Sequence, residues 1–434
     1  MTAPTTVAIR MYHVGFGDAF RITVVRDGVT WRMLLDCGVH SQGMRQPIEQ
    51  SVNEIIEDLT ADCAPGSPHL DVVAATHHHA DHISGFAVQA WEKVTVGEVW
   101  LPFVEDDTDT DAAGLKAAQV STAHHLQGLV AARVHQLSPE ARDDPHKWPP
   151  DLAAALAFAV NSSGNADATD RLIGRNGKRF ATPGHPVRYL PKKGDPNRIQ
   201  VAPDVVVHVL GPSRDPGELK RMDPPAGDGW HAFGTTATPT PDDGAPPLLF
   251  LPKYAAPLDQ LPRPLRDSLA TLDLDELTND DGVLAAASIL EQSVNNTSLF
   301  LVLDVAGSTF VFPGDSQYGA WQHVLNDPPS LALVSNAVFY KIGHHGSQNA
   351  TPQRFIDQIW ANNGYAMLPW WLVKAWQATI PFGPLLKDLD DHHHPTIRQD
   401  SATPVSPDVT VIDGRWSEVI LTVPATGGTD AGPA

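Results

Sequence analysis

Residues 76–82 read Thr-His-His-His-Ala-Asp-His, and they follow directly on a short, nearly all-apolar run. Such a run is typical of a strand that is buried on both faces. Neutral imidazoles and carboxylates at this spacing are ligands that zinc prefers. Because residues two apart in an extended loop point the same way, His77 and His79 can bind one ion. Asp81 and His82 lie beyond the bend and can reach a second ion.

Two further ligand-type positions follow predicted strands later in the chain. Asp315 comes after the apolar run Thr309 to Phe312, and His344 and His345 come after Ala337 to Ile342. Two dications about 3.5–4 Å apart need a carboxylate between them, and Asp315 is predicted to be that bridge. A single pair of histidines is typical of a solvated loop, whereas this many ligand-type side chains at strand ends predict a dinuclear metal site.

The remaining pattern predicts an α/β fold. Residues 6–38 are expected as two strands around the turn at residues 15–18, and Ile48 to Leu59 has the apolar spacing of a helix. Residues 113–160 are Ala-rich and predicted to be helical. The other expected strands are Leu70–Ala75, Val94–Leu101, Val187–Leu190, Val205–Leu210, Ser298–Asp304, Thr309–Phe312 and Ala337–Ile342.

The 434 residues are expected to form a single domain over residues 1–423, with insertions at about 102–200 and 213–290 and a disordered tail at 424–434. Residues 213–264 hold 11 of the 38 prolines, and proline resists both helix interiors and central strands. No secretory signal and no apolar run long enough to cross a bilayer is visible. Together with only two cysteines, Cys37 and Cys63, this predicts a cytoplasmic protein without membrane contact.

The chain is strongly acidic, because 30 Lys and Arg against 51 Asp and Glu give a net charge of −21. Such a body repels polyanions, and long nucleic acids bind mainly through neutralised phosphates. The exception is the basic stretch, Arg171 to Arg198, which holds eight Lys and Arg. It is expected either as a solubilising segment paired with acidic neighbours or as a phosphate-guiding lobe. In the second case Lys192 and Lys193 would contact a short or single-stranded anionic substrate.

These motifs together resemble the metallo-β-lactamase fold superfamily, whose signature is His-x-His-x-Asp-His. Within it, the chain is most similar to the hydrolase domain of DNA-uptake competence proteins of the ComEC type. The segments that match that group in order are Val14–Ala19, Leu34–Gly38, His77–His82, Val209–Pro212, Asn295–Ser298, Pro313–Asp315, Lys341–Ser347 and His394–Pro395.

The resemblance implies an αββα metallo-β-lactamase sandwich with long inserted lobes and two divalent metals at one edge of the two sheets. Zinc is the first expectation and manganese the second. Many members of the superfamily supply a third histidine to the first ion, but this chain has Asn-Asn-Thr-Ser at 295–298 there. The first ion is therefore expected to bind His77, His79, Asp315 and water. A histidine of the insertions could also complete this site.

The resemblance also favours roles for individual residues. His345 is expected as a ligand of the second ion beside His82, and His344 as the catalytic group on the substrate oxygen. Asp81 is expected to orient the nucleophilic hydroxide between the metals. The residues expected to order the site from outside are Asp18, Asp36 and His78. The residues considered for substrate contact are Asn296, Ser298 and His394.

The leading functional hypothesis is hydrolysis of phosphodiester bonds in nucleotides or nucleic acid by a metal-bound hydroxide. The same site could hydrolyse a lactone, thioester or amide, because a fold does not fix its substrate. The chain could instead be a metal-binding regulatory or interaction protein. Four tryptophans between Trp360 and Trp376 would then form a face for self-association or for a protein partner. Alternatively, they belong to the core or to a wall of the pocket.

Overall fold

The computed structural model describes residues 4–142, 147–163, 165–182, 184–219, 221, 293–374 and 376–424. Most of the expected insertion at 213–290 and nearly all of the expected tail lie outside these residues. No helix in the described ranges is both long and apolar enough to span a bilayer.

The first of two mixed sheets has eight strands. Its strands β3 to β6 run parallel to one another, and the strands on the other side of β3 pair antiparallel. In spatial order the strands are β14 (Val409–Ile412), β15 (Trp416–Val423), β1 (Thr5–Tyr12), β2 (Phe20–Arg26), β3 (Val29–Leu35), β4 (His69–Ala74), β5 (Thr95–Pro102) and β6 (Val187–Leu190).

The second sheet has seven strands and the same division. Strands β10 to β13 are parallel, and β7 to β10 pair antiparallel. In spatial order the strands are β13 (Thr396–Arg398), β12 (Tyr365–Leu368), β11 (Ala337–Lys341), β10 (Ser308–Phe312), β9 (Phe300–Val305), β8 (Val205–Gly211) and β7 (Arg198–Ala202).

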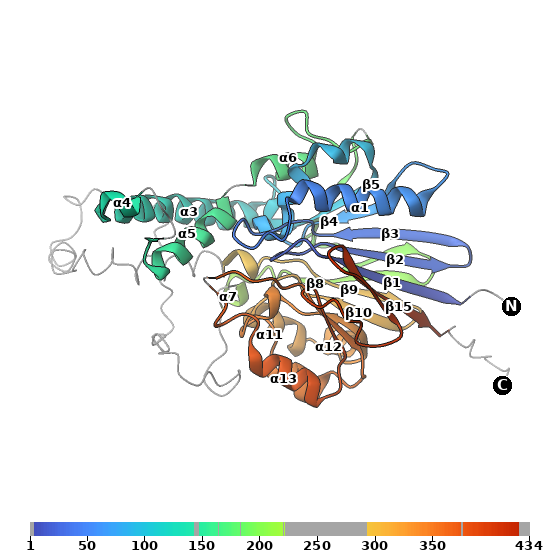
Figure 1. Cartoon of the computed structure of the whole chain (residues 1–434). Helices are drawn as coiled ribbons and strands as arrows, with labels where there is room; N and C mark the ends of the chain where they lie inside the picture. Colours follow the sequence, from blue (N-terminus) through green and yellow to red (C-terminus); the bar gives the residue numbers. More distant parts are fainter. Residues whose placement is uncertain are drawn as a thin grey trace, which may run out of the picture.

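The two sheets pack face to face with helices on both outer faces, as Figure 1 shows. Alternate side chains of both sheets, such as Ile9, Val207 and Phe310, share one buried cluster between them. Helix α1 (Ile48–Cys63) buries Val52 and Ile55 against the outer face of the first sheet. The helices on the outer face of the second sheet are α11 (Tyr318–Asn326), α12 (Pro328–Ser335) and α13 (Gly383–Asp391). The α/β prediction is confirmed as two mixed sheets between helical layers.

Most predicted elements are present, but residues 5–35 form three strands where two were expected. The turn between β2 and β3 consists of Asp27 and Gly28, both with positive φ. An Asp-Gly pair favours this two-residue hairpin turn, so the signal was present in the sequence.

The range expected as the first insertion, 102–200, includes β6 and part of β7, which are outer strands of the two sheets. Between β5 and β6 the chain forms α3 (Thr110–Gln136), α4 (Pro139–Arg142), α5 (Pro150–Ser163) and α6 (Ala166–Ile173). The first three of these helices extend past the ends of the strands in Figure 1. Helices α3 and α5 bury Leu126, Val130 and Leu152 against each other.

Candidate metal centre

Three loops at strand ends meet at one edge of the two sheets. The first runs from β4 into the short helix α2 (Ala80–Ile83), and the others follow β10 and β11. The chain is packed so closely here that Gly314, with φ of 58°, has no room for a Cβ. A Cβ at this position would lie 2.8 Å from the Cβ of Ser298 and 2.9 Å from the Cβ of Thr76. Glycine is required where backbones meet at this distance.

The six residues predicted as metal ligands lie together and are all buried. One group consists of His77, His79 and Asp81, and the other of Asp81, His82, Asp315 and His345. Within each group the potential ligand atoms lie within 4.8 Å of one another. Asp81 belongs to both groups, whereas the sequence placed Asp315 between the ions. Buried imidazoles and carboxylates in two adjoining groups are suited to divalent metals.

The histidines of the first group turn one nitrogen of each ring toward the other. His77 Nε2 lies 2.9 Å from His79 Nδ1. The opposite nitrogen of His77, Nδ1, lies 3.1 Å from both Ser298 Oγ and Thr76 Oγ1. The hydroxyl groups at Nδ1 fix the orientation of the His77 ring and leave Nε2 for a metal, as is common for metal-binding histidines.

The histidines of the second group are held in the same manner. His82 Nδ1 lies 2.9 Å from Asp36 Oδ2, and its Nε2 lies 3.0 Å from Asp315 Oδ2. His345 donates its Nδ1–H to the carbonyl of Pro369 at 2.6 Å, and its Nε2 lies 3.1 Å from Asp81 Oδ2. A carboxylate or carbonyl behind each imidazole is the arrangement that orients metal ligands.

Burial and charge act in opposite directions on these groups. Burial lowers the pKa of His77 well below its ordinary value and that of His79 to about 3. Burial also raises carboxyl pKa values, but neighbouring imidazoles outweigh it and hold the pKa of Asp81 well below its usual range. The imidazole of His82 and the ammonium of Lys341 do the same for Asp315. Near neutral pH the first group thus offers neutral imidazoles and an ionised carboxylate, the protonation state that metal binding requires.

His82 behaves differently from the other imidazoles. Burial lowers its pKa, but four surrounding carboxylates, Asp315 foremost, outweigh burial and raise that pKa well above the ordinary value. The excess of buried negative charge is therefore large enough to hold a proton on this imidazole. A divalent cation would satisfy the same excess.

Lys341 was not predicted as part of the site, although it is fully buried at the end of β11. Its Nζ lies 2.5 Å from Asp18 Oδ2 and 3.2 Å from Asp315 Oδ1. The signal was a single lysine within the apolar run Ala337 to Ile342, because a charged residue is buried only when it is paired.

The backbone of His344 has the left-handed conformation that residues other than glycine rarely adopt. His344 and His345 have φ of 43° and 50° and are followed by Gly346 at 80°. Two successive left-handed residues other than glycine are costly, and such strain gathers at functional sites. The His344 ring lies 2.8 Å from Ser347 Oγ through Nδ1 and 3.3 Å from Asn295 Nδ2 through Nε2. Its backbone N–H donates to Asp315 Oδ1 at 2.9 Å. It belongs to neither ligand group, in contrast to His345.

The residues expected around the ligands have distinct places. Asp36 accepts from both the backbone N–H and the hydroxyl of Thr76, at 2.7 and 2.8 Å, and holds His82. His78 turns away to Glu105, 2.9 Å from its Oε1. Ser298 accepts from the N–H of Asp315 at 3.2 Å and also contacts His77. Ser298 thus helps to orient His77 and Asp315, whereas the sequence suggested that it contacts substrate.

Asn296 and His394 contact other parts of the fold. Asn296 donates to the carbonyls of Leu219 and Arg221 and accepts from the N–H of Gln317. The ring of His394 stacks on Trp360 with centroids 3.6 Å apart. Both side chains therefore have local structural partners, and their proposed substrate contacts stay predictions.

The Trp-rich segment is largely internal. Trp360 and Trp376 are 5% and 7% exposed, and Trp370 and Trp371 are half-buried. Trp376 lies 5.1 Å from the ring of Phe16, which in turn lies 4.1 Å from that of His345. The four indoles thus pack inward, partly beside the ligand loops, instead of forming an exposed aromatic face.

Most cations of the basic stretch pair with carboxylates, and most of these carboxylates come from other parts of the chain. Arg171 is buried and donates to the carbonyls of Phe86 and Arg179. Five more of its eight cations lie within 4.0 Å of a carboxylate. These pairs are Arg175–Asp107, Lys178–Asp167, Arg188–Glu98, Lys192–Asp195 and Lys193–Asp111.

Helix α5 also reaches the candidate metal centre, which the sequence did not predict. Ser162 Oγ lies 3.2 Å from His79 Nε2, and the N–H of Asp81 donates to Asn161 Oδ1 at 3.3 Å. Asn165, just past the helix, donates to the carbonyl of His78 at 2.6 Å. No local pattern marks these residues, because polar residues at a helix end are common.

A histidine from the insertions completing the first group is not seen among the described side chains. His185 lies 2.9 Å from the carbonyl of Leu172, and His208 lies 3.7 Å from Asp304. His231 and the side chains of His124 and His125 lie outside what the structure describes.

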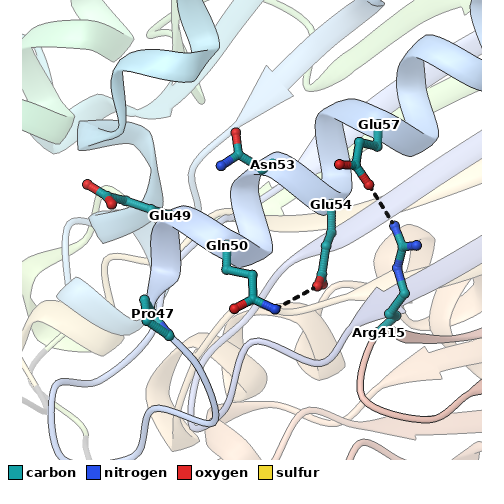
Figure 2. Close-up of a pocket in the computed structure, with 7 residues that line it drawn as sticks. All are labelled: Pro47, Glu49, Gln50, Asn53, Glu54, Glu57 and Arg415. Atoms are coloured by element: carbon teal, nitrogen blue, oxygen red, sulfur yellow. Dashed lines mark hydrogen bonds and ion pairs between the residues drawn. The ribbon is translucent and has the colours of Figure 1, made fainter.

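An open groove of about 460 Å³ lies along α1, away from these loops. Figure 2 shows its lining, in which Gln50 pairs with Glu54 and Arg415 with Glu57. None of the residues predicted for the metal site lines it.

Comparison with known proteins gives one short similarity. No protein-family model matches the chain. Over 67 residues, the chain is 36% identical to "ComE operon protein 3" of Bacillus subtilis (strain 168). The similar segment covers 15% of this chain and 8% of that protein. The chain therefore shares a partial similarity with the ComE operon protein and carries buried His/Asp groups that fit a metal site.

Proposed function

We propose that this chain is a dinuclear metal-dependent hydrolase with the αββα metallo-β-lactamase sandwich, formed as a single domain by residues 1–423. The observation that carries the proposal is the convergence of two buried ligand groups that share Asp81. Zinc is the first candidate for both ions and manganese the second, because imidazole and carboxylate ligands suit both.

The charge of the site supports two divalent ions. Four carboxylates, those of Asp18, Asp36, Asp81 and Asp315, are each at most 3% exposed, and the neighbouring permanent cation is Lys341. Metal binding requires a neutral imidazole at His82, and the four carboxyl groups then outnumber the single ammonium of Lys341. This buried excess of negative charge is unfavourable without counter-charge, and two dications would supply it.

Asp81 and His344 have separate proposed roles in the reaction. When bound, the two ions would lower the pKa of water enough to supply a nucleophile near neutral pH. Asp81 Oδ1 is buried and has no hydrogen-bond partner, so it is free to accept from that water and orient it. His344 is held by Ser347 at the edge of the ligand groups and is proposed to donate to the substrate oxygen.

The proposed substrate is a phosphodiester in a nucleotide or a short single-stranded nucleic acid. Two adjacent ions suit in-line displacement at phosphorus, since they stabilise both the attacking and the leaving oxygen. The partial similarity to the ComE operon protein agrees with the family resemblance on which this substrate class is proposed. A lactone, thioester or amide is the second candidate, favoured by the carboxylate partners of five of the eight cations in the basic stretch.

Metal analysis combined with a substrate panel tests the proposal. The purified chain is stripped with chelator, reloaded with zinc or manganese, and assayed on a bis-aryl phosphodiester, an aryl ester, a lactone and a thioester. We expect two metals per chain and turnover of the phosphodiester. Faster turnover of the esters would move the assignment to the second candidate, and a chain that binds no metal would refute the proposal.

A further inference from the structure

The C-terminal end of α5 is placed against the metal-ligand loop by contacts on both sides. Ala157 and Phe158 belong to the same buried cluster as Phe16 and Trp376. Phe158 stacks on Trp376 with centroids 5.2 Å apart and ring planes 21° from parallel. His40 Nε2 lies 3.3 Å from the carbonyl of Ala157. Because this packing fixes the helix, the side chains of its last turn have defined positions beside His79 and Asp81.

Asn161 leaves one donor unsatisfied inside this region. Its side chain is 1% exposed, and its Oδ1 accepts from the N–H of Asp81 at 3.3 Å. A backbone N–H can only donate, so the orientation of the amide is settled and Nδ2 is the remaining atom. Nδ2 is buried and has no hydrogen-bond partner. A buried donor without a partner is costly, which points to a ligand that it binds.

The atom that Asn161 Nδ2 binds would have to be an acceptor beside Asp81. The carboxylate of Asp81 also has a buried oxygen, Oδ1, without a partner. Asp81 Oδ1 can only accept a hydrogen bond or face a cation, so it suits the proposed ions or water on them, whereas Asn161 Nδ2 needs an oxygen that accepts. An anionic oxygen fits best, since charge-assisted hydrogen bonds are about twice as strong as neutral ones.

Ser162 contacts the first ligand group on the side of His79 that faces away from His77. Its Oγ lies 3.2 Å from Nε2 of His79, while Nδ1 of His79 faces His77. If the hydroxyl accepts Nε2–H, the lone pair of His79 is on Nδ1 and points toward His77 Nε2, whose own opposite nitrogen contacts Ser298 and Thr76. Two lone pairs directed at one point are the arrangement that two imidazoles need to share an ion.

We propose that α5 completes the candidate metal centre, with Ser162 as a positioning residue that fixes the metal-binding tautomer of His79 and Asn161 as a contact to an anionic oxygen of the substrate. This inference rests on the proposed metal-dependent function. It assigns to the helical segment 110–173 a direct part in the site, and it narrows the substrate class to compounds with an anionic oxygen at the scissile group, as in a phosphodiester.

The first experiment measures metal affinity by competition with a chelator, without reference to activity. Ser162→Ala should weaken binding of the more weakly held metal about 10- to 100-fold, the usual effect of losing an outer partner of a metal ligand. Ser162→Thr, which keeps the hydroxyl, should restore it. Ser335→Ala is the matched control, since Ser335 also ends a helix and donates to Ala332 within it, and it should leave the affinity unchanged.

The second experiment separates Asn161 from Ser162 through Asn161→Asp. This variant keeps the acceptor for the N–H of Asp81 but replaces the free donor with a carboxylate oxygen. Metal affinity should be unchanged or tighter, whereas the affinity of the metal-loaded protein for inorganic phosphate, measured by calorimetry, should fall at least about tenfold through repulsion. Asn326→Asp at the end of α11, where the amide contacts Gln322, is the matched control.

The outcomes distinguish this inference from the proposed function. If the wild-type chain binds no metal, the proposed function is wrong and this inference is wrong with it. If the wild-type chain binds metal and turns over substrate while Ser162→Ala and Asn161→Asp match their controls, only the role of α5 is refuted. Circular dichroism and the melting temperature of each variant verify that it is folded.

Discussion

The candidate metal centre and the basic stretch are both clusters of one residue type in the sequence, yet the fold treats them differently. His77, His79 and His82 stay together, and Asp315 and His345 join them from strand ends more than 200 residues away. The cations of residues 171–198 instead separate, and five of them pair with carboxylates, most of these from outside the stretch.

The difference between these two regions shows under which conditions residues that are close in sequence also cluster in space. The ligand loops leave buried strands, whose directions are fixed by the sheets, so their side chains must converge. Lys192 and Lys193 are exposed and long, and each can turn toward any nearby carboxylate. Surface ion pairs of this kind contribute little to stability, but they do neutralise charge that would otherwise attract an anion.

Replacing the carboxylate that both ligand groups share should have the largest effect. Asp81→Asn should lower the metal content and reduce turnover by more than about 100-fold, beyond the usual loss for an outer partner of a ligand. Metal analysis and kcat measure it, and Asp195→Asn in the basic stretch is the control. Retained metal with full activity would show that convergence in space does not mark the functional site.

The adjacent histidines should separate on mutation. His345→Ala should lose metal because His345 belongs to the second ligand group, whereas His344→Ala should keep metal and lose about 100-fold in kcat, as expected for a proton donor. Metal content and steady-state kinetics on the two variants decide between the roles. The reverse pattern would exchange the two assignments.

Metal removal should destabilise the chain in two steps. Metal at 100 times its dissociation constant stabilises a protein by about 3 kcal/mol, so a strong chelator should lower the melting temperature by several degrees. The group of His77 and His79 has fewer protein ligands than the group of His82 and His345, and its ion should leave first under a weak chelator. Equal release of both ions would mean that a further ligand completes the first group.

The smallest effect is expected in the basic stretch. Lys192→Glu with Lys193→Glu should raise KM for an anionic substrate less than about threefold, because both lysines already face carboxylates and exposed charges are screened by salt. Kinetics at low and high ionic strength measure it. A tenfold rise that disappears in salt would restore the phosphate-guiding lobe and remove the contrast between the two regions.

Much of the fold could be predicted because its signals are local. The spacing of Val52, Ile55 and Leu59 predicted α1, and the apolar runs predicted β4, β5 and β11 within one or two residues. The turn at Asp27-Gly28 that separates β2 from β3 was missed, and β7 and β12 to β15 were not predicted. Strands β12 to β14 have only three or four residues each. In the longer β15, Ile420 is 50% exposed, so the alternation typical of a half-buried strand is weak there.

The sequence alone determined the chemistry of the site, namely which ligand types stand at which strand ends. Only the tertiary structure decided that Asp81 is common to both ligand groups, that Lys341 pairs with Asp18, and that Ser162 contacts His79. The physical reason is the distance along the sequence between the residues that interact. Residue type and periodicity act over one strand or one helical turn, whereas these contacts join residues 83 to 323 positions apart, and the packing of two sheets and an inserted helix brings them together.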